Sequence, residues 1–211
     1  DVNGDGLGDL LVGAPYEDAP SAFSGQAYLY YGAASRALVL STLAREGNQA
    51  DARAGSTVAG IGDVNHDGYA DLAIASPYYD NGAAANAGRV TVYLGSDGEV
   101  TSFASWTLLG TQADAHLGSG LCGAGDVNGD GYDDLAVGSP GWDGDQAGEG
   151  RVEVFHGGPS GLATTAARTL DGNVVNAGFG AALASAGDVN RDGRDDLVIG
   201  TSTFTSAFTA E

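Results

Sequence analysis

Four short segments of the chain share a spacing of oxygen-bearing side chains that suits a hard cation. The clearest copy is residues 126–134, DVNGDGYDD, and the other copies are residues 1–9, 63–71 and 188–196. Each follows the pattern D-x-N-x-D-G-x-x-D, and Ca²⁺ takes about six to eight oxygen ligands in proteins. The glycine at position 6 permits the sharp turn that such a loop needs. Four copies, each followed by an apolar run, predict four calcium loops and up to four bound Ca²⁺.

The expected metal ligands occupy the same five positions in every loop. Positions 1, 3, 5 and 9 offer side-chain oxygens, and position 7 offers its backbone carbonyl. The expected side-chain ligands are Asp1, Asn3, Asp5 and Asp9; Asp63, Asn65, Asp67 and Asp71; Asp126, Asn128, Asp130 and Asp134; and Asp188, Asn190, Asp192 and Asp196. The expected carbonyl ligands are Leu7, Tyr69, Tyr132 and Arg194. His66 and Arg191 replace glycine at position 4, where we expect the side chain to point outward and binding to be kept.

The composition excludes several classes of function. The formal net charge is −20, and all eight basic residues are arginine, so the chain lacks the basic clusters that bind nucleic acid. Fourteen of the 28 acidic residues lie in the four loops, which gives much of the charge a local explanation. No apolar run approaches the length of a membrane span. Cys122 is the only cysteine, which excludes an internal disulfide, and its small neighbours favour a buried residue over a reactive thiol.

The whole chain repeats with the loops, which begin at residues 1, 63, 126 and 188. Each repeat contains four short runs with strand-like composition, separated by turn residues, and no helical periodicity. The expected strands after the loops are 9–15, 71–77, 134–140 and 196–201; the aromatic-rich strands are 25–32, 88–95 and 150–157; the weaker strands are 37–43, 105–109 and 168–170; and the small-residue strands are 55–61, 118–124 and 180–186. Four-stranded units around an axis predict an all-β, antiparallel β-propeller with the loop between strands 1 and 2. A parallel β-helix, whose rungs are shorter than this repeat, and an open solenoid are the alternatives.

The residues that flank each loop carry a resemblance to a known family. Phe179-Gly180 precedes one loop and Gly13-Ala14-Pro15 follows another, which is similar to the FG-GAP repeat of integrin α-subunit propellers and bacterial surface proteins. Ala54 and Leu117 depart from the expected phenylalanine, and the fourth repeat lacks the proline. The resemblance implies a seven-bladed ring, of which this chain is about half. The expected division is 1–53 (partial blade), 54–115, 116–177 and 178–211 (partial blade), and a dimer that completes one ring fits this division poorly.

The resemblance also implies that the calcium turns lie on one face and the remaining loops on the other. Tyr16, Tyr78, Tyr79 and Trp142 recur just after the proline, on the expected ligand face. These rings either contact a protein or glycan ligand, or pack over the blade edge. The three histidines occupy unrelated repeat positions, so we expect no catalytic site and no enzyme.

The expected function is that of an extracellular or cell-surface module, with a periplasmic location as the alternative. It would adhere to a protein or glycan, or to neighbouring subunits of a surface assembly, and calcium would be structural or would bridge to the ligand. A purely structural module of a larger assembly and an accessory domain of a secreted enzyme are the other hypotheses.

Overall fold

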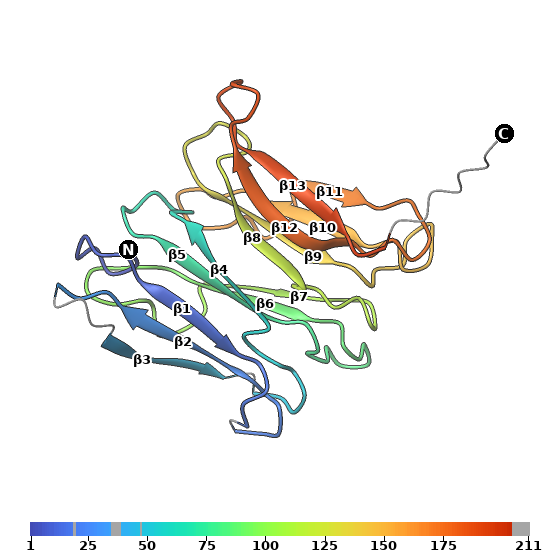
Figure 1. Ribbon diagram of the computed structural model, residues 1–211, viewed down its shortest axis with the longest axis horizontal. Coiled ribbons are helices and arrows are strands. Elements are labelled where there is room, and N and C mark those ends of the chain that lie inside the picture. Colours follow the sequence, from blue (N-terminus) through green and yellow to red (C-terminus); the bar gives the residue numbers. More distant parts are fainter. Residues whose placement is uncertain (19, 35–38, 47, 204–211) are drawn as a thin grey trace.

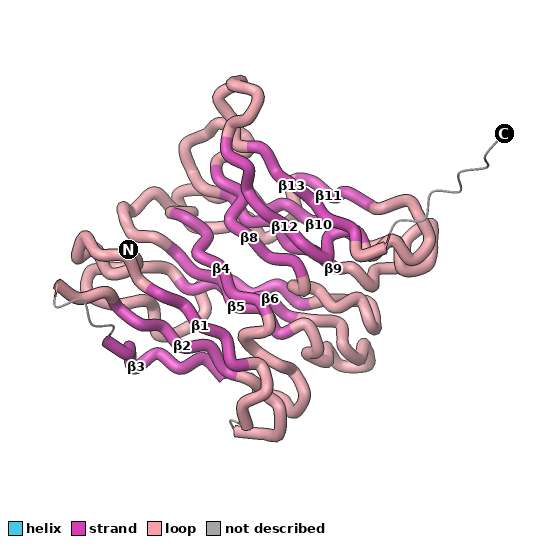
Figure 2. Tube along the Cα trace, in the orientation of Figure 1, coloured by secondary structure: helices cyan, strands magenta, loops and turns pink. Residues whose placement is uncertain are grey.

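The chain folds entirely into antiparallel β-sheets. The structure is a computed structural model that describes residues 1–18, 20–34, 39–46 and 48–203. In the ranges so described the secondary structure consists of strands and turns, without a helix (Figures 1 and 2). It follows that these ranges hold no helix long and apolar enough to cross a membrane.

Four sheets follow one another along the chain. The first sheet contains β1 (Leu10–Ala14), β2 (Gln26–Tyr31) and β3 (Val39–Glu46); the second β4 (Thr57–Gly62), β5 (Asp71–Ser76), β6 (Arg89–Tyr93) and β7 (Trp106–Leu109); the third β8 (Gly120–Gly125), β9 (Asp134–Ser139), β10 (Arg151–Phe155) and β11 (Arg168–Asp171); and the fourth β12 (Phe179–Gly187) and β13 (Asp196–Thr201). Within each sheet, neighbours in sequence pair antiparallel. The expectation of four-stranded antiparallel blades is therefore confirmed.

The innermost strands of successive sheets lie side by side. β4 packs against β8, and β8 packs against β12, while the outer strands diverge (Figure 1). This is the radial arrangement of a β-propeller. The outer strand expected at 37–43 is β3, which begins at residue 39 and ends three residues later than expected, and residues 37 and 38 lie outside the described ranges.

The inner strand of each complete blade, β4 or β8, leads into its loop through a β-bulge. The pairing register shifts between Gly60 and Gly62, and again between Gly123 and Gly125. Gly62 has φ +77°, a region that favours glycine, and a Cβ there would lie 2.0 Å from Asp133 Oδ2. The glycine directly before the loop thus ends regular pairing and turns the chain into the loop.

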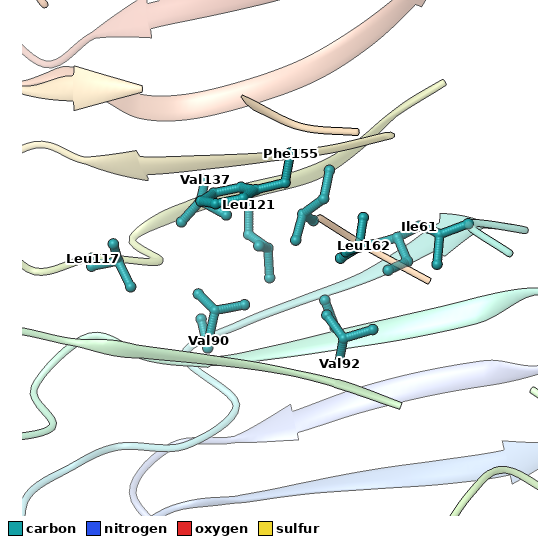
Figure 3. Packing of buried hydrophobic residues seen from close by; sticks show 12 residues of the cluster. Ile61, Val90, Val92, Leu117, Leu121, Val137, Phe155 and Leu162 are labelled. Carbon is teal, nitrogen blue, oxygen red and sulfur yellow. The ribbon is translucent and has the colours of Figure 1, made fainter. Parts of the chain in front are cut away.

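The main core fills the space between the second and third sheets. Val90 and Val92 of β6 point from one sheet toward Leu121, Val137 and Phe155 of the other (Figure 3). Strand alternation explains this, because residues two apart lie on the same face. β5 and β9 are buried along their whole length, as expected for strands covered on both faces. Packing between the two blades thereby fixes the positions of the loops that lead into β5 and β9.

The phenylalanine-glycine motif joins one blade to the previous one. The backbone N–H of Phe179 donates to the carbonyl of Glu149 (3.0 Å), and Gly150 forms a parallel bridge with Phe179. Leu117 and Ala54 make the same bonds to Ala87 and Ser24, at 3.0 and 2.8 Å. The bond uses only the backbone, so the departures from phenylalanine leave it intact.

Candidate functional site: four acidic loops and the opposite face

The first aspartate of each loop organises the backbone around its own carboxylate. Asp126 Oδ1 accepts from the N–H groups of Gly129 (2.7 Å) and Asp130 (3.0 Å), and its Oδ2 accepts from Gly131 (2.8 Å). Burial alone would raise the pKa of Asp126, but these N–H groups together hold it below its usual value. The carboxylate is therefore kept charged by the turn that it creates.

The side chains at positions 1, 3 and 5 converge on one space. Asp126 Oδ1 and Asn128 Oδ1 share the N–H of Asp130, which donates to the latter at 2.8 Å. Asn128 Nδ2 lies 2.8 Å from Asp130 Oδ2, and the equivalent distances in the other three loops are 3.4, 2.8 and 3.1 Å. The four loops thus share one geometry, in which the predicted side-chain ligands at these positions are neighbours.

The aspartate at position 9 also accepts hydrogen bonds from backbone N–H groups, which the sequence pattern does not predict. Asp134 is fully buried, and its two oxygens accept from the N–H groups of Val127 (3.0 Å) and Gly157 (2.9 Å). Asp71 accepts in the same way from Val64 and Gly95, both at 2.9 Å. Burial raises the pKa of Asp71 to about 6, although both hydrogen bonds act to lower it. Asp9 accepts likewise from Val2 and Gly32, so in the first three loops the position-9 carboxylate joins the loop to the end of the aromatic-rich strand.

The donor set fits calcium by its chemistry. Each loop offers three carboxylates, an amide oxygen and a carbonyl, all of them the hard oxygen donors that Ca²⁺ prefers. Among the described residues no hydrogen bond is made to the carbonyls of Leu7, Tyr69, Tyr132 and Arg194, which leaves these oxygens available to a cation. The carboxylates at positions 1, 5 and 9 accept hydrogen bonds from backbone N–H groups. Over the described ranges, no three His, Cys, Asp or Glu side chains are close enough to hold a metal ion.

Neighbouring loops are bonded to one another in a row. Asp133, at position 8, accepts from the N–H of Asp63 (2.8 Å), and its own N–H donates to the carbonyl of Asp63 (3.3 Å). Asp195 makes the equivalent pair of bonds to Asp126, both at 3.0 Å. His66 is exposed, with φ +58°, and its Nδ1 lies 2.9 Å from the carbonyl of Gly131. The first ligand of one loop is therefore positioned by the next loop.

The opposite face begins where β1, β5 and β9 end, because the loops precede these strands. Two of the four aromatic residues there pack onto their own blade. The guanidinium of Arg89 lies 4.3 Å from the ring centre of Tyr79, and that of Arg151 lies 4.1 Å from the ring centre of Trp142. Arg151 is also paired with Asp171, at 2.6 Å from Nε to Oδ1. Tyr79 and Trp142 are thus part of the blade edge.

The other two aromatic residues stand on either side of a junction between blades. Arg53 lies over the ring of Tyr78 at 4.0 Å and near the ring of Tyr16 at 5.5 Å. Tyr78 also contacts the ring of His116, with 4.8 Å between the centroids. Sequence reasoning missed Arg53 and His116, although both occupy the same place in their repeats. Their role depends on contacts between blades, which a spacing within one repeat cannot show.

Comparison with known proteins agrees with this geometry. The FG-GAP repeat model matches residues 1–30, 54–93, 117–155 and 179–210, which together make up more than half of the chain. The chain belongs to the FG-GAP repeat family. The resemblance drawn from the loop-flanking residues is therefore confirmed.

Curated relatives of this FG-GAP chain are integrin alpha chains. Human integrin alpha-IIb is 39% identical over 148 residues, which is 67% of this chain and 14% of the relative. Integrin alpha-PS5 of Drosophila melanogaster is 35% identical over 67% of the chain and 14% of the relative. Integrin alpha-7 of Rattus norvegicus is 34% identical over 70% of the chain and 12% of the relative. The chain thus spans only a small part of the length of these relatives.

Proposed function

We propose that this chain is a segment of a calcium-stabilised, cell-surface β-propeller that binds a protein ligand on the face opposite its acidic loops. The observation that carries the proposal is the separation of the two faces. The oxygen donors gather at one end of the blades, where they tie strands and loops together. The aromatic rings of Tyr16 and Tyr78 gather with Arg53 at the other end. The similarity to integrin alpha chains favours an adhesive role over other uses of the same fold.

Calcium is proposed as a structural staple. The five oxygens of each loop would hold one ion, which would neutralise part of the repulsion among its carboxylates. With a site of about 10⁻⁴ M affinity and about 1 mM calcium, each ion would contribute about 1.4 kcal/mol of stability. Four ions would then supply about 6 kcal/mol, a large part of the usual 5–15 kcal/mol for a domain.

We also propose that residues 54–115 and 116–177 are complete blades, and that the chain contributes about half of a seven-bladed ring. β12 packs against β8 as β8 packs against β4, which supports this division. The bounds of the blades are taken from the spacing of the loops in the sequence.

A purely structural module is the second candidate. The packing of Tyr79 on Arg89 and of Trp142 on Arg151 favours it, because these rings serve the blade itself.

Binding to arrays of extracellular proteins and glycans, in calcium and in EDTA, separates the two functions. The adhesive proposal predicts retention of a protein ligand in calcium and weaker retention in EDTA, together with a lower melting temperature. Calcium-dependent melting with no ligand retained in either buffer would leave the structural module as the function.

A further inference from the structure

A pocket opens at the junction between the first and second blades, on the face opposite the loops. It has a volume of about 300 Å³, and its walls include Tyr16, Arg53 and Tyr78. Ser56, Thr57 and Ser119 also line it. A pocket of this volume is at the lower end of the range for ligand sites, and suits a side chain rather than a large molecule.

Arg53 is the only cation on these walls, and it is held without a counter-charge. Its Nε is buried and makes no hydrogen bond, and no described carboxylate lies within ion-pair distance of its guanidinium. Since Nε is buried while the residue as a whole is only half-buried, the terminal Nη groups are the ones that a ligand in the pocket could reach.

The aromatic rings shape what Arg53 can still bind. Tyr78 lies against the guanidinium at 4.0 Å, and Tyr16 lies at 5.5 Å. Because a guanidinium covered by a ring keeps its N–H groups free at the edge, it remains able to bind a carboxylate through two parallel hydrogen bonds. The backbone of Arg53 is also fixed, since its N–H donates to the carbonyl of Phe23 at 3.1 Å. The donor is therefore preorganised.

The serine and threonine hydroxyl groups of the pocket can only accept hydrogen bonds from a ligand. Ser56 Oγ donates to the carbonyl of Arg53 (2.7 Å), Ser119 Oγ donates to that of His116 (2.8 Å), and Thr57 Oγ1 donates to that of Ser119 (3.1 Å). A hydroxyl has one proton, so these three are committed within the chain. The pocket thus suits a ligand that carries a carboxylate beside hydrogen-bond donors.

We infer that this pocket binds the acidic side chain of an extended segment of a protein partner. Such a segment supplies the carboxylate for Arg53 and backbone N–H groups for the hydroxyl oxygens. A sugar acid is less well matched, because the ring of Tyr78 already contacts Arg53 and His116 and has less surface for a sugar to stack on. The net charge of −20 does not prevent the contact, since charges beyond about 8 Å are screened at physiological salt. The inference rests on the proposed ligand-binding function and specifies its ligand.

The test follows the Nε–H resonance of Arg53 by NMR in the full chain with calcium present. The probes are the capped peptide Gly-Gly-Glu-Gly-Gly, its glutamine analogue, and glucuronate. We expect the glutamate peptide to shift the Arg53 resonance saturably and the glutamine analogue to bind at least about tenfold more weakly, equivalent to about 1.4 kcal/mol. Equal binding of the two peptides, binding of glucuronate alone, or no saturable shift would each overturn the inference.

Variants distinguish the pocket from the wider function. Arg53→Gln should abolish the peptide shift and weaken any protein ligand found on the arrays, while Arg168→Gln, at an exposed site on β11, should change neither. If Arg53→Gln unfolds the chain, Arg53→Lys is the second variant. It keeps the positive charge but lacks the planar guanidinium with its paired donors, so it should bind the glutamate peptide about tenfold more weakly. Full retention of an array ligand by folded Arg53→Gln would reject the pocket and leave the adhesive function standing. Binding of the glutamate peptide with no ligand retained on the arrays would support the pocket and reject the adhesive function.

Discussion

Removing the buried carboxylate of Asp134 should destabilise the protein even when calcium is absent. In Asp134→Ala, the N–H groups of Val127 and Gly157 lose acceptors at 3.0 and 2.9 Å. Both donors are partly buried, so each one left without an acceptor costs about 1–2 kcal/mol, and the variant should lose about 2–4 kcal/mol of unfolding free energy. Asp130→Ala, at an exposed position, breaks a bond to the N–H of Tyr132 and one to Asn128. It should cost less than about 1 kcal/mol in EDTA.

Urea unfolding in EDTA and in calcium measures both effects. In EDTA the two variants should differ clearly, because without the ion only the hydrogen bonds of the Asp134 carboxylate contribute. In calcium both should lose the additional stabilisation from the ion at that loop, and Asp145→Ala, on an exposed loop, should behave as the wild type in either buffer. If the unfolding free energy of Asp134→Ala in EDTA lies within about 1 kcal/mol of the wild-type value, the Asp134 carboxylate does not stabilise the protein independently of the metal.

Three further perturbations test the contacts between and within blades. Asp133→Ala should cost about 1 kcal/mol in EDTA and weaken calcium binding at the preceding loop, because it removes the 2.8 Å bond to that loop's first N–H; urea unfolding and calcium titration measure the two effects. Burial raises the pKa of the Cys122 thiol to about 11, so its reaction with a disulfide reagent at pH 8 should be about a hundredfold slower than that of a free thiol and should accelerate as the pH rises through 11. A rate equal to that of free cysteine would contradict this burial. Arg151→Lys should lower the unfolding free energy by about 1–2 kcal/mol in urea, since lysine replaces neither the paired bonds to Asp171 nor the stack on Trp142; an unchanged value would mean that the ion pair is fully screened.

The repeat in the sequence predicted the order of the strands because each blade is a local structure. Loop, strand and turn recur at fixed offsets, and neighbours in sequence pair with one another. The entry to the loop was not predicted. Gly62 and Gly125 precede their loops in the sequence, and their position next to Asp63 and Asp126 could have indicated a bulge.

The contacts between repeats could not be predicted from the pattern of one repeat. Asp133 and Asp195 occupy position 8, where the other two loops have Gly8 and Ala70, so the shared motif does not include them. Their bonds to the preceding loop arise only when blades stack. Likewise, Arg53 reaches Tyr78 across a junction, and no offset within a repeat relates the two residues. The predicted ligands follow from chemistry, while their supports follow from packing.

Isothermal titration of the metal-free chain with calcium tests the central claim most directly. The account predicts four Ca²⁺ per chain and a higher melting temperature in the loaded protein, with both effects reversed by EDTA. It also predicts that replacing Asp126 with alanine removes one site and leaves the others measurable. A chain that binds no calcium, or that melts at the same temperature with and without it, would contradict the account.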